Sequence, residues 1–127
     1  MAKPIYGSIG WVDLTVPDAP KLRDFYQQVT GWRPQPVNMG GYSDFSMLSG
    51  SGEEVAGICH ARGANAKLPP VWLVYVVVEN LELALEKCAK LGGKAVSPVR
   101  MAGGSRYAVI QDPAGAFVAL WEPGEAA

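Results

Sequence analysis

The chain has 127 residues, of which 49% are hydrophobic and 18% are charged, so we expect a single globular domain rather than a disordered chain. Its 11 basic and 12 acidic residues give a net charge of -1 without a basic cluster, so neither nucleic acid nor an anionic membrane is an expected partner. The longest apolar run, residues 71–78, is too short to cross a membrane, and the N-terminus lacks the apolar core of a signal peptide. We therefore expect a cytoplasmic protein.

Residues 8–16 predict a strand, because their side chains alternate between two faces. One face carries Val12, Leu14 and Val16, and the other carries Trp11, Asp13 and Thr15. Asp18 then predicts the N-cap of a helix. The apolar positions of this helix recur with helical spacing at Leu22, Phe25, Tyr26 and Val29. Gly31 predicts its end.

The second half repeats this arrangement, with residue numbers that differ by 62 through strand and helix and by 63 through the later glycines. Residues 71–78 predict a buried strand, and Asn80 predicts an N-cap. The apolar helix face consists of Leu81, Ala84, Leu85, Cys88 and Leu91. Three short strand candidates follow each helix, and Asp112-Pro113-Ala114-Gly115 predicts a type I turn. The sequence thus predicts one domain of two βαβββ units, residues 8–60 and 71–123, joined by a linker at 61–70.

The ordered set of these motifs resembles the vicinal oxygen chelate superfamily, which includes glyoxalase I, bleomycin-resistance proteins and extradiol dioxygenases. The motifs are Val-Pro-Asp before the first helix, Gly-Trp or Gly-Gly after each helix, and Asp-Pro-x-Gly before the last strand. The resemblance implies an α+β fold in which two tandem βαβββ units form a curved mixed sheet around a cleft, with the helices on the outer face. In metal-dependent members, His or Glu from the first and last strand of each unit holds a divalent ion in that cleft.

Carried over residue by residue, these ligand positions fall at Trp11 and Leu73 in the first strands and at Ala56 and Ala119 in the last strands. None of these side chains has a lone pair that could hold the ion. The two cysteines, Cys59 and Cys88, stand alone and are interpreted as small buried hydrophobes, with a reactive thiol as the alternative. We therefore expect no metal cofactor. The alternative, a divalent metal, would need other ligands, for instance Asp13, Asp44 and His60.

If the four ligand positions face inward, their neighbours two residues away line the same chamber. These neighbours are Asp13, Thr15, Ile58, His60, Tyr75, Val77, Phe117 and Trp121. A chamber with aromatic walls and few polar groups is typical of a pocket for a flat or apolar molecule, and equally of a filled core. The predicted ligand-binding residues are Trp11, Ala56, Leu73, Tyr107, Phe117, Ala119 and Trp121.

Candidate catalytic chemistry centres on Asp13, which projects beside Trp11 toward the presumed cleft. A poorly solvated carboxylate has a raised pKa and can act as a general acid or base, with Tyr75 or His60 as its partner. Structural interpretations of both residues stay open: Asp13 can be a hydrogen-bond acceptor, and His60 can be a solvated residue at a strand end. Arg106 is either an exposed arginine or a contact for an anionic ligand.

Three functions are compatible with these residues, and the favoured one is a metal-free protein, similar to bleomycin-resistance proteins, that binds a small apolar or aromatic molecule between the units. The alternative is a lyase, isomerase or hydrolase that uses Asp13 with Tyr75 or His60 as an acid–base pair. A metal-dependent glyoxalase or dioxygenase ranks last. Four tryptophans and the linker favour a homodimer. The sequence specifies neither the ligand, nor the pathway, nor whether the units swap between subunits.

Overall fold

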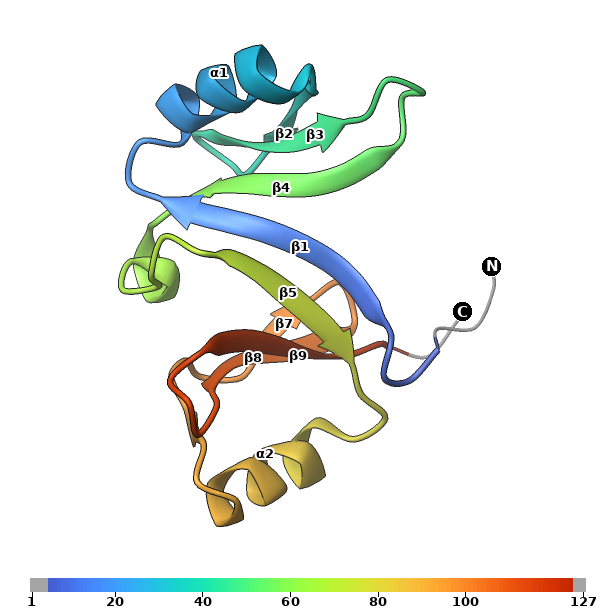
Figure 1. Ribbon diagram of the computed structural model, residues 1–127, viewed down its shortest axis with the longest axis vertical. Helices are drawn as coiled ribbons and strands as arrows, with labels where there is room; N and C mark the ends of the chain where they lie inside the picture. Colours follow the sequence, from blue (N-terminus) through green and yellow to red (C-terminus); the bar gives the residue numbers. More distant parts are fainter. Residues whose placement is uncertain (1–4, 125–127) are drawn as a thin grey trace. The chain divides into compact units, whose positions relative to one another are not determined.

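The computed structural model describes residues 5–124, apart from the side chain at position 64, and divides into two compact units. The N-terminal unit is Trp11–Trp72, and the C-terminal unit combines Leu73–Ala127 with Met1–Gly10. Each unit contains one long helix and a mixed sheet, as the α+β class predicts (Figure 1). Neither helix in the described part of the chain has the length and hydropathy of a membrane-spanning segment.

The N-terminal unit has the predicted order of one strand, one helix and three strands. Its elements are β1 (Ile9–Val16, whose first two residues belong to the other unit), α1 (Ala19–Thr30), β2 (Arg33–Asn38), β3 (Ser43–Leu48) and β4 (Glu54–His60). The strands lie in the order β2-β3-β4-β1, in which β1 is parallel to β4 and the other pairs are antiparallel. A short 3-10 helix, Gly63–Asn65, occupies the predicted linker.

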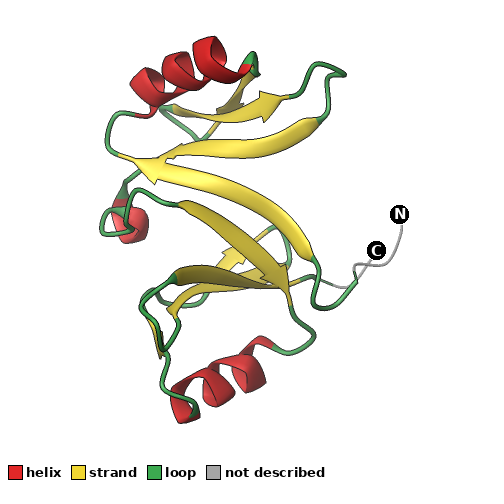
Figure 2. Ribbon diagram, viewed as in Figure 1, coloured by secondary structure: helices red, strands yellow, loops and turns green. Residues whose placement is uncertain are grey.

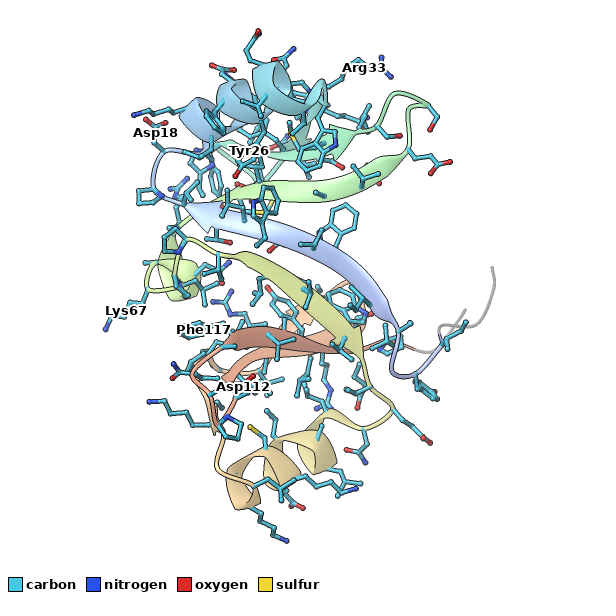
Figure 3. The ribbon with its side chains drawn as sticks, viewed as in Figure 1. Asp18, Tyr26, Arg33, Lys67, Asp112 and Phe117 are labelled. Carbon is cyan, nitrogen blue, oxygen red and sulfur yellow. The ribbon has the colours of Figure 1, made fainter. Side chains whose placement is uncertain are left out.

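Local sequence signals set both ends of α1. The Asp18 carboxylate accepts a hydrogen bond from the backbone N–H of Lys21, and Gly31 adopts the left-handed conformation that ends the helix. Tyr26, labelled in Figure 3, packs with Leu22 against the buried core of the sheet. That core consists of Leu14, Val16, Ala19, Phe45, Met47 and Ile58. Phe25 and Val29 were also predicted on the apolar face, but they are exposed because α1 meets the sheet along a narrower stripe.

The C-terminal unit follows the same plan with an interrupted edge strand. Its elements are β5 (Trp72–Val77, whose first residue belongs to the N-terminal unit), α2 (Leu81–Lys90), β6 (Lys94–Ala95), β7 (Arg100–Ala102), β8 (Ser105–Gln111) and β9 (Phe117–Glu122). The strands lie in the order β5-β9-β8, and β6 and β7 both pair with β8. Figure 2 shows α2 to one side of this sheet, where it packs on Leu120, Ala108 and Ile110.

Four strands follow α2 where the sequence predicted three, because one edge strand is split. Pro98 has no N–H to donate to the ladder. At the break, the hydroxyl of Ser97 accepts a hydrogen bond of 2.9 Å from the backbone N–H of Val109. The predicted helix face also ends early: α2 stops at Lys90, and Leu91 is 76% exposed. The βαβββ plan is therefore kept, with β6 and β7 as two parts of one strand.

The first and last strands of each unit pair in the same register. Asp13 lies opposite Gly57 in β1 and β4, and Tyr75 lies opposite Ala119 in β5 and β9. The residue that matches Ala119 is therefore Gly57, not the predicted Ala56. A bulge explains the correction: Met47 pairs with Ala56 but the next residue, Leu48, pairs with Glu54. One extra residue in β4 moves each following side chain to the opposite face.

Replacing Gly57 with alanine should destabilise the N-terminal unit. A Cβ atom there would lie 3.0 Å from the Cβ of Asp13 and 3.4 Å from the indole Nε1 of Trp11. The Asp13 Cβ is fixed by the backbone and cannot yield, so we expect Gly57→Ala to lower the free energy of unfolding by about 1–2 kcal/mol. Urea unfolding measures this loss. Gly50→Ala is the control, because its Cβ would meet open space; equal stability of the two variants would contradict the packing described here.

A salt-bridged network attaches α2 to the sheet. Arg106 and Glu122 lie opposite each other in β8 and β9, and the Nε of Arg106 donates to Glu122 at 3.0 Å. The other carboxylate oxygen of Glu122 accepts from the backbone N–H of Leu81 at 2.9 Å, at the start of α2, while Arg106 also pairs with Glu82. Arg106 and this N–H lower the pKa of Glu122. Arg106 thus forms structural ion pairs. It is neither the exposed arginine nor the contact for an anionic ligand that the sequence suggested.

The Glu122 network predicts a specific loss of stability in acid. A carboxyl with a lowered pKa stabilises the fold fully above its ordinary pKa, and this contribution disappears as the pH falls through the folded-state pKa. We expect Glu122→Gln to cost about 1–2 kcal/mol at pH 7, after allowing for solvent screening, and this cost to shrink as the pH falls through the folded-state pKa. Urea unfolding from pH 3 to pH 7 tests this. Glu86→Gln, an exposed carboxylate on α2, should change stability little at any pH; a Glu122→Gln penalty independent of pH would contradict the network.

Candidate functional site

The most distinctive surface lies on the C-terminal sheet, on the side opposite α2. Residues paired directly across strands share a face, so the registers of β5, β7, β8 and β9 place one set of side chains together. We call this set the ring face; it consists of Leu73, Tyr75, Val77, Arg100, Tyr107, Val109, Phe117, Ala119 and Trp121. The sequence predicted six of these nine as ligand-binding or catalytic residues, and the structure brings those six together. Val77 was predicted as a neighbour in the same chamber.

Three aromatic rings form the centre of the ring face. The rings of Tyr107 and Trp121 are stacked, with centroids 5.6 Å apart and planes 19° apart. Tyr75 contacts both, at 5.9 Å from Tyr107 and 6.2 Å from Trp121. Tyr75 is buried, whereas Tyr107 and Trp121 are half-buried. Phe117, at the start of β9 (Figure 3), is half-buried in the same way. Such rings offer a stacking surface for a flat molecule.

Two ring-face residues were not predicted from the sequence. Val109 is 1% exposed and lies opposite Ala119, so the pattern of β8 alone could have identified it. Arg100 lies opposite Tyr107 on β7, a strand whose register depends on the break at Pro98. The Nη2 atom of Arg100 is shut off from solvent and has no hydrogen-bond partner among the described residues.

In the N-terminal unit, the face opposite α1 carries Trp11 and Asp13. The indole of Trp11 lies against Gly57, which occupies the place that Ala119 has in the other unit. Ser46 lies opposite Gly57 on β3, and its buried hydroxyl is without a partner among the described residues. Ala56, predicted beside Trp11, and its neighbour Ile58 lie instead on the face of Leu14 and the buried core.

His60 is held by Asp44 rather than by Asp13. One carboxylate oxygen of Asp44 accepts from the backbone N–H of His60 at 2.9 Å and lies 3.0 Å from its Nδ1. The His60 side chain is only 19% exposed, so it is not the solvated residue at a strand end that the sequence also allowed. His60 shares the face of Val16, and Asp13 lies on the opposite face. The register therefore does not assemble an Asp13–His60 acid–base pair; Tyr75 as the partner of Asp13 stays a prediction.

Both cysteines are interpreted as structural. Burial raises the pKa of the Cys59 thiol well above its ordinary value, and the nearby charges of Asp13 and Asp44 raise it further. A thiol with a raised pKa stays protonated, and the thiolate is the reactive form. Cys88 packs against the core beneath α2, where its sulfur lies beside Gly93.

The side chains at the metal-ligand positions of the resembling family do not fit a metal ion. With the corrected register these positions are Trp11, Gly57, Leu73 and Ala119, none of which offers an oxygen, sulfur or imidazole nitrogen. The described part of the chain also contains no group of three or more His, Cys, Asp or Glu side chains placed to hold a metal. The alternative ligand set of Asp13, Asp44 and His60 is therefore not formed.

Comparison with known proteins places this geometry in a family. A protein of Mycobacterium tuberculosis (strain CDC 1551 / Oshkosh) named "Putative glyoxylase CFP32" is 34% identical over 91% of the chain and 46% of its own length. The anthracycline biosynthesis protein DnrV of Streptomyces peucetius is 28% identical over 93% of the chain and 48% of its own length. The chain thus spans about half the length of these curated relatives.

Solved structures show the same fold at low sequence identity. Methylmalonyl-CoA epimerase from Mycobacterium tuberculosis has a TM-score of 0.58 at 17% identity, with 98% of this chain and 93% of that chain covered. The hypothetical protein BH1468 from Bacillus halodurans C-125 has a TM-score of 0.60 at 14% identity, with 94% and 96% covered. The family model that matches residues 8–120 decides the assignment: the chain belongs to the Glyoxalase/Bleomycin resistance protein/Dioxygenase superfamily.

Proposed function

We propose that this chain binds a small, flat, largely apolar or aromatic molecule on the ring face, without a divalent ion at the ligand positions of its family. The observation that carries the proposal is the contact group of Tyr75, Tyr107 and Trp121. These rings stand on the sheet face that α2 leaves uncovered, and two of them are only half-buried. A fold of this family supports many chemistries, so the function is argued from these side chains.

The composition of the ring face favours a flat, largely apolar ligand over a polar ligand. Around the rings lie Leu73, Val77, Val109 and Ala119, which are all buried and bear no polar side-chain atoms. Ligand sites of this kind gain affinity from apolar burial and ring stacking, and a few polar groups fix the orientation. Arg100 is the charged member of the ring face, and the two tyrosines contribute hydroxyl groups; Gln111 and Lys94, in line with Phe117 at the sheet edge, extend the same side of the sheet.

Two further observations support a binding role. The family's metal positions are filled by carbon side chains and a glycine, and the Trp11 indole lies against that glycine. Two curated relatives, DnrV and DauV, are named as anthracycline biosynthesis proteins, a name that refers to fused-ring compounds. A molecule with such rings matches the stacking surface of Tyr107 and Trp121.

Removing either stacked ring should weaken binding of a neutral flat probe. We expect Tyr107→Leu and Trp121→Leu each to raise the dissociation constant of anthraquinone-2-carboxamide about fivefold to tenfold, because a leucine keeps apolar area but loses ring stacking. Isothermal titration calorimetry measures the constants. Phe25→Leu is the matched control, an exposed ring on α1 of the other unit. Unchanged affinity in both ring-face variants, or absence of any binding to the unmodified protein, would refute the proposal.

Removal of metal should leave binding intact. We expect the dissociation constant of the same probe to stay within about twofold after exhaustive dialysis against EDTA, since no ring-face side chain is positioned by a bound ion. The titration is repeated with untagged protein before dialysis, after dialysis and after addition of Zn²⁺ or Mn²⁺. A loss of affinity on chelation that either ion restores would show that the ligand is held through a metal.

A further inference from the structure

We infer that Arg100 recognises a carboxylate on the ligand, so that the ring face selects aromatic acids over neutral aromatic molecules. This inference rests on the proposed function and narrows its ligand class. It follows from the position of Arg100 beside the stacked rings and from its Nη2 atom, which has no hydrogen-bond partner among the described residues.

Arg100 stands at the end of a row of ring-face side chains. Arg100 on β7 lies opposite Tyr107 on β8, and Tyr107 lies opposite Trp121 on β9. Because directly opposed residues share a face, the guanidinium emerges on the same side as the stacked rings. The next residue, Met101, projects to the other side and is 68% exposed. A ligand stacked on Tyr107 thus lies one strand spacing, roughly 5 Å, from the strand that carries Arg100.

Arg100 is half-buried, and its guanidinium is short of acceptors. Its Nη2 atom is inaccessible to solvent and makes no hydrogen bond to any described residue. Charged side chains are almost never buried without a partner, because the lost hydration must be replaced by an acceptor. A ligand carboxylate that contacts the accessible part of Arg100 supplies an acceptor for this guanidinium.

The other arginine of this sheet shows what a partnered guanidinium looks like in the same unit. Arg106 lies on the α2 side and donates to both Glu122 and Glu82. The carboxylate of Asp112 accepts from two backbone N–H groups in the turn before β9. These acidic groups are therefore engaged elsewhere, and Arg100 has none of them as a partner.

The geometry of guanidinium selects the ligand chemistry. Its planar fork of N–H donors matches the two oxygens of a carboxylate, and such charge-assisted hydrogen bonds are stronger than neutral ones. A planar acid attached to a ring system satisfies both Arg100 and the stacked rings of Tyr107 and Trp121. A neutral amide of the same shape keeps the stacking but loses the charge.

The test compares anthraquinone-2-carboxylate with anthraquinone-2-carboxamide, two probes that share their rings. We expect the unmodified protein to bind the acid at least tenfold more tightly than the amide, and Arg100→Gln to reduce this preference to about twofold or less, with amide affinity unchanged. Arg100→Lys should retain part of the preference. Lys87→Gln is the control, since it removes an exposed positive charge from α2, on the other side of the sheet, and should leave the preference intact.

The outcomes separate the inference from the function on which it rests. If the protein binds acid and amide equally, or if Arg100→Gln keeps the preference, the carboxylate role is refuted while ring-face binding stands. If neither probe binds, the proposed function fails and the inference with it. Thermal unfolding distinguishes a structural role: we expect Arg100→Gln to melt at the same temperature or higher, because no hydrogen bond to a described residue is lost and a buried donor without an acceptor is removed. A large drop in melting temperature would show that Arg100 supports the fold instead.

Discussion

The parallel pairing of the first and last strand in each unit determines which side chains share a face, and the functional argument depends on it. The pairing is equivalent in the two units: Asp13 lies opposite Gly57, and Tyr75 lies opposite Ala119. The last-strand residue is small in both cases. Gly57 leaves room for the Trp11 indole, and Ala119 lies among the rings of the other unit. A one-residue change in either register would bring core side chains to these faces.

The two faces of the C-terminal sheet divide structural and ligand-directed chemistry between them. On the α2 side, Arg106, Glu82 and Glu122 satisfy one another and the start of the helix. On the ring face, aromatic and aliphatic side chains surround a single arginine whose Nη2 atom lacks a partner among the described residues. The contrast between Arg106 and Arg100 is physical: the first guanidinium donates to acceptors within the chain, and the second has a nitrogen without an acceptor among the described residues.

Much of the fold could be predicted because its signals are local. Asp18 and Asn80 cap the helices as expected, Gly31 ends α1, and Asp112 to Gly115 forms the turn whose spacing the sequence shows. The period-two pattern also predicted that Tyr75, Tyr107 and Trp121 contribute to one site. Each of these features depends on residues a few positions apart, so pattern alone is sufficient.

The rest could not be predicted because it depends on pairing across strands. A bulge in β4 puts Ala56 and Ile58 on the core side, and no residue type in that strand predicts the bulge. The break in the edge strand sets the register of Arg100, and the Asp44–His60 contact joins two strands at their ends. Phe25, Val29 and Leu91 follow the helical period yet are exposed, because periodicity does not reveal how wide a stripe the sheet can cover.

A crystal structure of the protein with anthraquinone-2-carboxylate, grown in chelator, would show whether the ring face binds an aromatic acid without a metal ion. We expect the ring system to stack on Tyr107 or Trp121, with its carboxylate within hydrogen-bond distance of Arg100. A ligand bound elsewhere on the chain, or an ion coordinated beside Trp11 and Gly57, would contradict it.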